Sequence, residues 1–458
     1  MENVVALQNP WKRGQPALQG EIITRRILSK IKSWLNADEI LLIKGARQTG
    51  KTTIIYSLVE HLLASGVKPQ NIFYFLLDNL KLQEEFSRHP YALKNTIETF
   101  LGQTLESYPE RVYVFLDEVQ KFSGFADVVK EYYDLLKRVK FILSGSSILQ
   151  LSDRISESLR GRTMSFVVEP FSLTEVVPQA PAFSFADLHD AEQLRRHYAA
   201  AAPFQNEITL ALQKQFVFGA MPRIYLSETN EQRQLRLEEY LQALIQRDLV
   251  ETLRTAKYLD LEKLLRLLSL QTGQLLKISS LATQLQLTAA TVKKYLALAE
   301  EAFVIDRLPP FFSNRRKGLI KEPKVYFRDM GMCNYLSRKA GMDLLHQTNL
   351  GHEAENFVHT ILNQVSALAQ TPSAQYFYRT TEQDEVDFVL QENTHAPLPI
   401  EVKYQARLTP SDYKPLLHFM QEESLDLGLV VSKNLFEQVQ VEDKQVVTLP
   451  LWFFALLA

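Results

Sequence analysis

A run of residues bounded by glycines has the composition and spacing of a loop that binds phosphate groups. It consists of Gly45, Ala46, Arg47, Gln48, Thr49, Gly50, Lys51, Thr52 and Thr53. The apolar residues before the run predict a buried strand, and those after it predict a helix, as such a loop requires. Backbone N–H groups and the positive helix end are expected to bind phosphate oxygens, with Lys51 on the β- and γ-phosphates and Thr52 on Mg²⁺. A glycine-containing turn is the alternative.

Two adjacent carboxylates, Asp117 and Glu118, follow a second apolar run at residues 111–116. A parallel strand there would deliver both to the carboxyl edge of the sheet. Asp117 is expected to hold Mg²⁺ opposite Thr52, and Glu118 is expected to orient and polarise the attacking water. A helix N-terminus with acidic residues in its first turn is the alternative interpretation. Together with the loop, the pair predicts Mg²⁺-dependent hydrolysis of a nucleoside triphosphate.

Ser144 follows a predicted strand at residues 139–143. Its hydroxyl is a candidate sensor of the γ-phosphate or of the attacking water. Capping of a helix by Ser146 or Ser147 is the competing interpretation of the same serine-rich stretch.

Three arginines are candidates for meeting the charge that develops on a transferred phosphoryl group. Arg160 and Arg162 lie between two predicted strands, and Arg47 lies inside the loop itself. Surface salt bridges are the alternative for Arg160 and Arg162, since exposed arginines are common. An arginine that acts on a neighbouring subunit would require a homo-oligomer.

Length and composition limit the possible architecture. A chain of 458 residues predicts two to four domains, and 46% apolar with 23% charged residues is ordinary for a soluble globular protein. The single cysteine, Cys333, excludes a disulfide framework and suits a reducing cytosol. Neither a membrane-spanning run nor a signal core is evident, so a cytoplasmic location without membrane contact is expected. The apolar run at 451–457 predicts a buried last strand.

The first part of the chain, from about residue 20 to 173, alternates apolar strands with helical segments, which predicts a parallel α/β sheet. Residues 184–258 are rich in helical spacing and predict a helical lid over the nucleotide, with an inserted loop at 199–203. Residues 259–339 predict a winged helix-turn-helix. Its helices are expected at 260–271 and 278–285 and from an N-cap at Thr288, and its wing strands at 303–308 and 324–327.

Basic residues of this module suggest DNA as a partner, because phosphate contacts supply most non-specific affinity for DNA. The candidates are Lys293 and Lys294 on the third helix, and Arg315, Arg316 and Lys317 with Lys321 and Lys324 at the wing. The third helix lacks Arg, Asn and Gln among its first seven residues, which disfavours reading of base edges. Protein contact alone is the alternative.

Residues from 340 onward carry a second set of candidate catalytic groups. A helical Glu355, then Asp387, then Glu401 and Lys403 on adjacent strands resemble the restriction-endonuclease-like nuclease fold. The resemblance implies that Glu355, Asp387 and Glu401 hold one or two Mg²⁺ ions, with Lys403 helping to activate water. An inactive scaffold is the alternative. The 16 Asp and Glu against 6 Lys and Arg from residue 340 to the end also disfavour a polyanion.

The motifs GARQTGKTT, LDEVQ, LSGSS, LRGR and EPFSLTE, in this order, resemble AAA+-superfamily ATPases that carry a C-terminal domain of unknown function. The resemblance implies ATP as the nucleotide. It also implies that Pro222 and Met221, in an element similar to the Gly-x-Pro of signal-transducing ATPases, pack near the adenine. Ser144 stands where many relatives have threonine, which keeps the hydroxyl.

The predicted fold class is α/β, in four domains. They are a P-loop AAA+ ATPase domain at 1–183, a helical lid at 184–258, a winged helix at 259–339 and a restriction-endonuclease-like domain at 340–458. The first functional hypothesis is an Mg²⁺-dependent ATPase that couples ATP turnover to DNA engagement and to a metal-dependent nuclease. The second is a nucleotide-gated switch for protein interactions, with the C-terminal domain as a docking surface.

Overall fold

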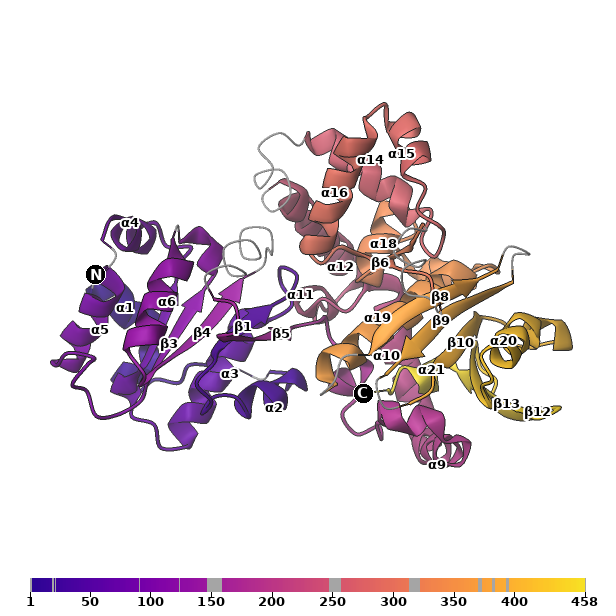
Figure 1. Cartoon of the computed structure of the whole chain (residues 1–458), viewed down its shortest axis with the longest axis horizontal. Coiled ribbons are helices and arrows are strands. Elements are labelled where there is room, and N and C mark those ends of the chain that lie inside the picture. The colour runs from indigo at the N-terminus through magenta and orange to yellow at the C-terminus, as the bar shows by residue number, and fades with distance from the viewer. Residues whose placement is uncertain are drawn as a thin grey trace. The chain divides into compact units, whose positions relative to one another are not determined.

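The computed structural model describes residues 2–18, 20, 22–89, 91–122, 124–145, 159–246, 257–312, 322–369, 373–380, 384–392 and 395–457. The chain divides into two compact units, Met1–Val168 and Glu169–Ala458 (Figure 1). None of the helices in the described residues combines the length and the apolar character needed to span a membrane.

The first unit is built on a five-stranded parallel sheet with the order β2-β3-β4-β1-β5. Its strands are β1 (Ile40–Lys44), β2 (Ile72–Leu76), β3 (Val112–Asp117), β4 (Val139–Gly145) and β5 (Thr163–Val167). The strands are near-continuous apolar runs because a parallel sheet is covered on both faces. This arrangement confirms the α/β fold class, and the strands predicted before the loop, at 111–116 and at 139–143 are β1, β3 and β4.

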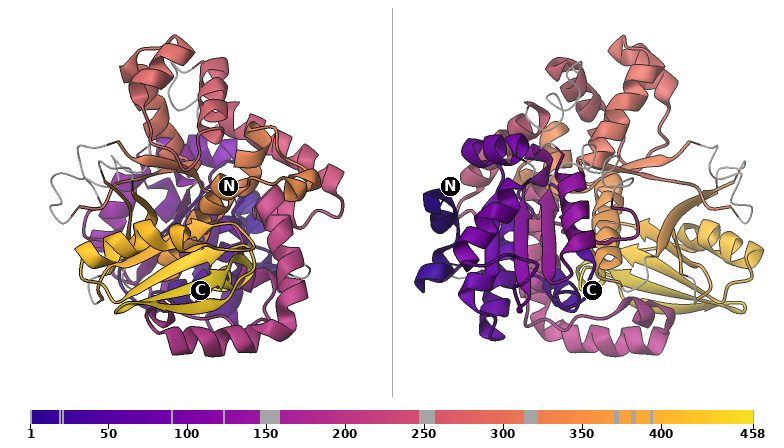
Figure 2. Two further views of the ribbon diagram at one scale, coloured as in Figure 1. Left: turned by 90° about the vertical axis from the view of Figure 1, so that its right-hand side faces the viewer. Right: turned by 60° about the vertical axis from the view of Figure 1, so that its left-hand side comes forward.

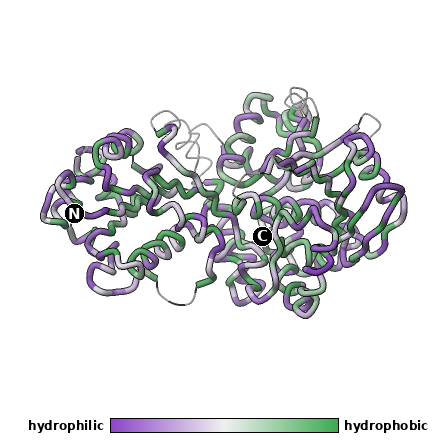
Figure 3. Tube along the Cα trace, turned by 60° about the horizontal axis from the view of Figure 1, so that its bottom comes forward, coloured by the Kyte–Doolittle hydropathy of each residue, from purple (hydrophilic) through white to green (hydrophobic). Residues whose placement is uncertain are grey.

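Helices lie on both faces of this sheet (Figure 2). They are α1 (Glu2–Gln8), α2 (Ile27–Lys32), α3 (Lys51–Ala64), α4 (Leu80–Arg88), α5 (Ala92–Leu101) and α6 (Phe125–Leu135), with the 3₁₀ helices η1 (Pro10–Arg13), η2 (Pro69–Asn71) and η3 (Val119–Lys121). Figure 3 shows hydrophobic residues along the interior strands and mixed hydropathy along the outer helices.

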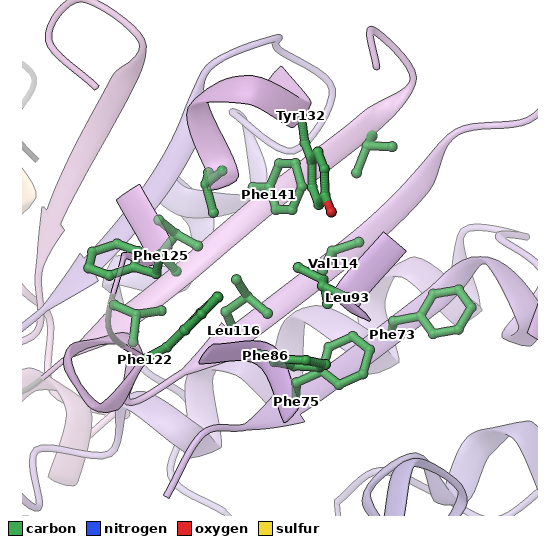
Figure 4. Close-up of a cluster of buried hydrophobic side chains, with 14 of the residues drawn as sticks. Phe73, Phe75, Phe86, Leu93, Val114, Leu116, Phe122, Phe125, Tyr132 and Phe141 are labelled. Atoms are coloured by element: carbon green, nitrogen blue, oxygen red, sulfur yellow. The ribbon is translucent and has the colours of Figure 1, made fainter. Parts of the chain in front are cut away.

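An aromatic cluster fills one face of the sheet, between the strands and α4–α6 (Figure 4). Phe75 and Phe86 meet edge to face with ring centroids 5.6 Å apart. Phe73, Phe122 and Phe141 extend the same cluster. Burying one such side chain stabilises a fold by about 1.5–3 kcal/mol, so this face anchors the sheet whose edge carries the candidate site.

The helical part of the second unit begins with α8 (Leu173–Val176), η4 (Phe185–His189), α9 (Ala191–Ala201), η5 (Ala202–Phe204), α10 (Gln205–Phe218), α11 (Pro222–Tyr225) and α12 (Asn230–Ala243). The predicted inserted loop at 199–203 is wrong, because α9 and η5 run through it. Alanine is the strongest helix former, and a proline near the start of a helical turn costs little. The prediction of a loop gave more weight to the polar residues around 199–203 than to this helix propensity.

Three helices and a hairpin follow. They are α14 (Tyr258–Ser269), α15 (Ile278–Leu285), α16 (Ala289–Glu301), and the antiparallel strands β6 (Ile305–Leu308) and β7 (Lys324–Phe327). The predicted helices are confirmed, and the Thr288 side chain accepts a hydrogen bond from Thr291 N at the start of α16. The predicted wing tip, Arg315, Arg316, Lys317 and Lys321, lies outside the described residues.

The last part is a six-stranded mixed sheet with the order β12-β13-β11-β10-β9-β8. Its strands are β8 (Ala374–Arg379), β9 (Glu385–Gln391), β10 (Leu398–Lys403), β11 (Leu427–Ser432), β12 (Glu437–Val441) and β13 (Lys444–Pro450). The accompanying helices are α18 (Met330–Leu336), η7 (Met342–His346), α19 (Gly351–Leu368), α20 (Pro410–Glu422) and α21 (Leu451–Phe454).

The expected last strand at 451–457 is buried but is not a strand. β13 ends at Pro450, and the residues after it form α21. The proline fixes its own φ near the value at a helix start, and the following aromatic side chains pack on Tyr198, whose ring lies 5.5 Å from that of Phe453. The apolar pattern of residues 451–457 is compatible with a strand or a helical turn, and the packing of their side chains stabilises the helical turn.

Candidate functional site

The glycine-bounded loop connects the end of β1 to the start of α3, as predicted. Gly45 has φ 151°, and a Cβ on it would lie 2.4 Å from the carbonyl oxygen of Val168. Gly50, with φ 94°, precedes the first residue of α3, Lys51. Both glycines are therefore required, the first by close approach of β5 and the second by its left-handed backbone.

Lys51 lies across this loop and is 5% exposed. Its Nζ donates to the carbonyl oxygens of Gly45 at 3.0 Å and Ala46 at 2.8 Å. Two contacts that the sequence did not predict brace the loop: Thr49 Oγ1 donates to Ala46 O at 2.9 Å, and Arg25 Nη1 donates to Thr49 O at 2.6 Å. The ammonium is thus positioned inside the loop.

Asp117 is the centre of the site and is 0% exposed. Its Oδ2 accepts from Thr52 Oγ1 at 2.8 Å and from the Tyr74 hydroxyl at 2.9 Å. Its Oδ1 accepts from the backbone N–H of Glu118 at 3.1 Å and from the hydroxyl of Ser144. The structure therefore brings together Thr52, Asp117, Glu118 and Ser144.

Tyr74, on the neighbouring strand β2, is the member of this group that sequence reasoning missed. Burial, reinforced by the nearby carboxylate, raises the pKa of its phenol far above the usual value, so the hydroxyl stays protonated and donates. The two-residue repeat of strands is the signal that could have found it, since Tyr74 pairs with Phe115 and therefore lies on the same face of the sheet as Asp117, two residues further along β3.

Glu118 adopts an unusual backbone conformation, with φ 58° and ψ 46°. A residue other than glycine in this left-handed region costs about 1–3 kcal/mol and is concentrated at functional sites. Gln120 Nε2 donates to the Glu118 carboxylate. A short 3₁₀ helix, η3, begins after Glu118, but neither carboxylate lies in its first turn, because Asp117 is the last residue of β3 and Glu118 precedes η3.

The arginine candidates differ in their surroundings. Arg162 pairs with Asp134 of α6 through Nε at 3.0 Å and Nη2 at 3.2 Å, which is the salt bridge given as its alternative role. Arg160 is exposed on the turn before β5, and Arg47 is half-buried in the loop. The finger role stays a prediction for all three. Ser146 and Ser147 lie outside the described residues.

The Gly-x-Pro element belongs to the second unit. Gly219 has φ 77°, and a Cβ on it would lie 2.1 Å from Asp329 Oδ1. Asp329 Oδ2 accepts from Ala220 N at 2.8 Å, and burial raises the pKa of this carboxyl to about 6. Asp329 thus fixes the turn before Pro222. Contact of Pro222 or Met221 with adenine stays a prediction.

The C-terminal candidates converge within the second unit. Glu355 comes from α19, Asp387 from β9, and Glu401 with Lys403 from β10. Asp387 N donates to Glu401 Oε2 at 3.3 Å, and Val402 N donates to Asp387 Oδ2 at 2.9 Å. Lys403 Nζ lies 2.5 Å from Glu401 Oε1, so Glu401 and Lys403 share one face of β10.

Lys324 of β7 lies among these carboxylates and is 1% exposed. Its Nζ is 2.8 Å from Glu355 Oε1, 2.5 Å from Glu385 Oε1 and 3.2 Å from Asp387 Oδ1. Its assignment to an exposed basic wing is therefore wrong. The apolar residues that follow it in β7 were the signal that this strand is buried.

Burial and charge interactions inside this cluster shift the pKa values of its carboxylates in different directions. Burial would raise the pKa of Glu355, but the ammonium of Lys324 together with hydrogen bonds from His352, Lys324 and Tyr326 outweighs burial and lowers that pKa to about 2. Burial, followed by the carboxylates of Glu355 and Glu401, raises the pKa of Asp387 well above its usual value. The carboxylates of the cluster therefore do not share one protonation state.

The proposed DNA-contacting residues are described only in part. Lys293 and Lys294 are exposed on α16. Arg315, Arg316 and Lys317 lie outside the described residues, so the structure describes only the α16 part of the predicted basic surface.

Three segments of the chain match family models. Residues 37–177 match a family described as AAA domain. Residues 209–348 and 350–452 match two domains of unknown function, DUF8612 and DUF4143.

The curated relatives are uncharacterized proteins. One from Mycobacterium tuberculosis is 26% identical over 303 residues, and the match covers 65% of this chain but only 59% of that relative's length. One from Methanocaldococcus jannaschii is 23% identical over 459 residues, covering 96% of this chain and 92% of the relative. One from Haemophilus influenzae is 20% identical over 435 residues, covering 93% and 96%.

Two solved structures are also similar to parts of the chain. A Walker-type ATPase of Pyrococcus abyssi is 18% identical and covers 69% of this chain and 96% of its own, with a TM-score of 0.43. The Hsp104–ADP complex of S. cerevisiae is 15% identical and covers 78% and 47%, with a TM-score of 0.31. The AAA match at residues 37–177 coincides with the parallel sheet and its phosphate-binding loop. This part of the chain therefore has the parallel sheet and the phosphate-binding loop of the AAA domain that its sequence matches.

Proposed function

We propose that the protein is an Mg²⁺-dependent ATP hydrolase whose site comprises the loop at residues 45–53 together with Asp117, Glu118 and Ser144. One observation carries the proposal: Thr52 Oγ1 lies 2.8 Å from Asp117 Oδ2, beside a loop that holds the Lys51 ammonium. A hydroxyl and a carboxylate at this separation are the oxygen donors that Mg²⁺ takes in proteins. The donor set therefore fits the ion. Bound there, Mg²⁺ would supply charge neutralisation to the phosphate oxygens.

Each residue has a role in this proposal. Lys51, held by the carbonyls of Gly45 and Ala46, is positioned to transfer its hydrogen bonds to phosphate oxygens that enter the loop. Glu118 follows a buried strand in a left-handed conformation that turns it away from the strand direction, and it orients the attacking water. Ser144, fixed on Asp117, is the sensor of the γ-phosphate.

Nucleotide binding by the full chain tests this proposal. Lys51→Met keeps the apolar stem but removes the ammonium, so we expect ATP affinity to fall at least about a hundredfold, about 2.8 kcal/mol. Isothermal titration calorimetry with ATP and Mg²⁺ measures it. Lys94→Met, on α5 and paired with Glu98 at 2.7 Å, is the matched control and is expected to bind normally. Equal affinity for the Lys51 variant and the wild type would remove the loop from the site.

DNA binding by the module of α14, α15 and α16 is the second candidate function, favoured by the exposed Lys293 and Lys294. Replacing both lysines by alanine is expected to lower the slope of log affinity against log salt by about 2, since each phosphate contact releases about one counterion. Lys263→Ala, exposed on α14, is the control. If the wild type binds no DNA with or without ATP, the protein-interaction switch replaces this candidate.

A further inference from the structure

We infer that Lys324 is a built-in counter-cation of the C-terminal carboxylate cluster, so that the cluster does not accept a divalent cation until the Lys324 side chain is removed. The resemblance to a nuclease fold places Mg²⁺ among Glu355, Asp387 and Glu401. The structure places an ammonium there instead. This inference is independent of the ATPase proposal, because every residue involved belongs to the second unit.

The hydrogen-bonding capacity of Lys324 is matched by its surroundings. An ammonium has three donors, and Nζ has three carboxylate partners, on Glu355, Glu385 and Asp387, at 2.8, 2.5 and 3.2 Å. A buried charge is tolerated when it is paired in this way. Lys324 therefore meets the same need for positive charge that a metal ion would meet.

The carboxylate oxygens also have other donors. Tyr326 donates from its hydroxyl to Glu355 Oε1 at 2.5 Å, and Val402 N donates to Asp387 Oδ2 at 2.9 Å. Lys403 Nζ lies 2.5 Å from Glu401 Oε1. Mg²⁺ requires near-octahedral oxygen coordination at about 2.0–2.1 Å, which these oxygens reach only by giving up their present hydrogen bonds. The donor set does not fit the ion as it stands.

The backbone holds Lys324 in this position. Three residues along β7, Phe327 N donates to Asn356 Oδ1 at 2.7 Å, and Asn356 Nδ2 donates back to Phe327 O at 3.0 Å. This reciprocal pair fixes β7 to α19, the helix that carries Glu355. A free cation would have to displace an ammonium that is covalently attached to a fixed strand.

The cluster is also covered from the side of α14. Gly273, with φ 75°, lies so close that a Cβ on it would be 2.8 Å from Glu355 Oε2. Gly273 N donates to Val325 O at 2.9 Å, which ties the turn after α14 to β7. This turn and β7 therefore cover the Glu355 side of the cluster. The cluster is therefore a joint between the three-helix module and the C-terminal sheet.

The test is Tb³⁺ binding to the full chain, read by luminescence sensitised from aromatic side chains such as Tyr326. Lys324→Ala is expected to gain a saturable signal at least about tenfold tighter than any wild-type signal. Adding Asp387→Asn to Lys324→Ala is expected to abolish the gain. Lys339→Ala is the matched control, because Lys339 pairs with Glu353 of the same helix and its loss changes the charge equally.

Two results overturn the inference. One is an Asp387-dependent Tb³⁺ signal, or Asp387-dependent cleavage of nucleic acid, in the wild type. The other is a folded Lys324→Ala variant that gains no site. If that variant does not fold, Lys324→Gln, which keeps a donor on an uncharged side chain one bond shorter, is scored by the same criteria. If neither variant folds, restoration of folding by Mn²⁺ supports the inference, and failure of Mn²⁺ to restore it counts against it.

Discussion

Asp117 has one donor for each of the roughly four hydrogen bonds that a carboxylate can accept. Thr52, Tyr74, Ser144 and the N–H of Glu118 all donate to it, from four different positions in the sequence. Such a network is stabilising only while every member is satisfied, because an unpaired buried polar group costs about 1–3 kcal/mol. The position of each hydroxyl around Asp117 is therefore fixed before any ligand arrives.

Tyr74→Phe removes one of these donors and leaves the ring in place. We expect ATP affinity to stay within about twofold and the Mg²⁺ concentration for half-maximal hydrolysis to rise, because Asp117 loses a hydrogen bond that orients it. Hydrolysis rates across an Mg²⁺ titration measure the effect. Tyr113→Phe is the control, a buried tyrosine of β3 whose hydroxyl contacts Asn36 at 3.4 Å. An unchanged Mg²⁺ dependence in Tyr74→Phe would contradict the account.

Asp329 predicts a pH dependence of the second unit. Burial raises its pKa from 3.8 to about 6, so the native state binds a proton more readily than the unfolded chain. Proton binding by Asp329 therefore stabilises the native state fully below about pH 4, and this stabilisation is lost as the pH rises through 6. Asp329→Asn removes this titration, and its melting temperature is expected to vary less than that of the wild type between pH 4 and 7. Parallel curves for the two proteins would refute the assignment.

At the scale of elements, the phosphate-binding loop depends on a sheet whose edge strand is protected. β2 is one of the two edge strands, and its backbone is bonded by side chains of the N-terminal segment. Asn9 donates to Tyr74 O at 2.9 Å and accepts from Tyr74 N at 2.7 Å, while Gln8 accepts from Leu76 N at 3.0 Å. Unpaired edge groups invite pairing with other chains, so this segment completes the sheet next to Tyr74.

Asn9→Ala tests this role of the N-terminal segment. Asn9 is 0% exposed, and its loss leaves the N–H and C=O of Tyr74 without those partners. We expect the unfolding free energy of the first unit to fall by about 2 kcal/mol. Chemical denaturation of the variant measures the change. Asn95→Ala, at an exposed position on α5, is expected to differ from the wild type by less than about 0.5 kcal/mol. A similar loss in both variants would contradict the role.

Local sequence signals predicted most elements correctly and failed where tertiary packing decides. The strands of the parallel sheet are apolar runs flanked by turns, and Thr288 is a helix cap by its chemistry alone. Residues 199–203 were misjudged because polar neighbours masked the helix propensity of alanine. Residues 451–457 were misjudged because an apolar run is compatible with a strand or a helical turn until its packing partners are known.

At the scale of the whole molecule, the sequence shows which segments are acidic or basic, but it does not show where their charged side chains lie in the fold. Residues 117 and 118 were found because a motif fixes their relation to Lys51. Lys324 was assigned to a basic surface, and its burial among Glu355, Glu385 and Asp387 arises from contacts between segments distant in sequence. Spacing along one chain carries no signal for such a contact.

The proposed arginine finger is a prediction about assembly. If Arg160 acts on a neighbouring subunit, the Arg160→Ala variant and the Lys51→Met variant are each inactive alone. In a mixed oligomer, an Arg160→Ala subunit with an intact loop can lie next to a Lys51→Met subunit that still supplies Arg160. We expect the mixture to regain hydrolysis, measured as phosphate release against mixing ratio. Arg162→Ala is the comparison, since Arg162 pairs with Asp134 in the same subunit. If the rate of phosphate release at every mixing ratio is only the sum of the rates of the two variants alone, Arg160 does not act between subunits.

The central claim is that the edge formed by β1, β3 and β4 hydrolyses ATP through Glu118. Glu118→Gln keeps the size and the hydrogen-bonding shape of the side chain but removes the charge that polarises water. Single-turnover hydrolysis of bound ATP measures this step directly, with Glu84→Gln on the exposed face of α4 as the control. The account predicts that Glu118→Gln binds ATP as tightly as the wild type and hydrolyses it at least about a hundredfold more slowly. Wild-type turnover in that variant would contradict it.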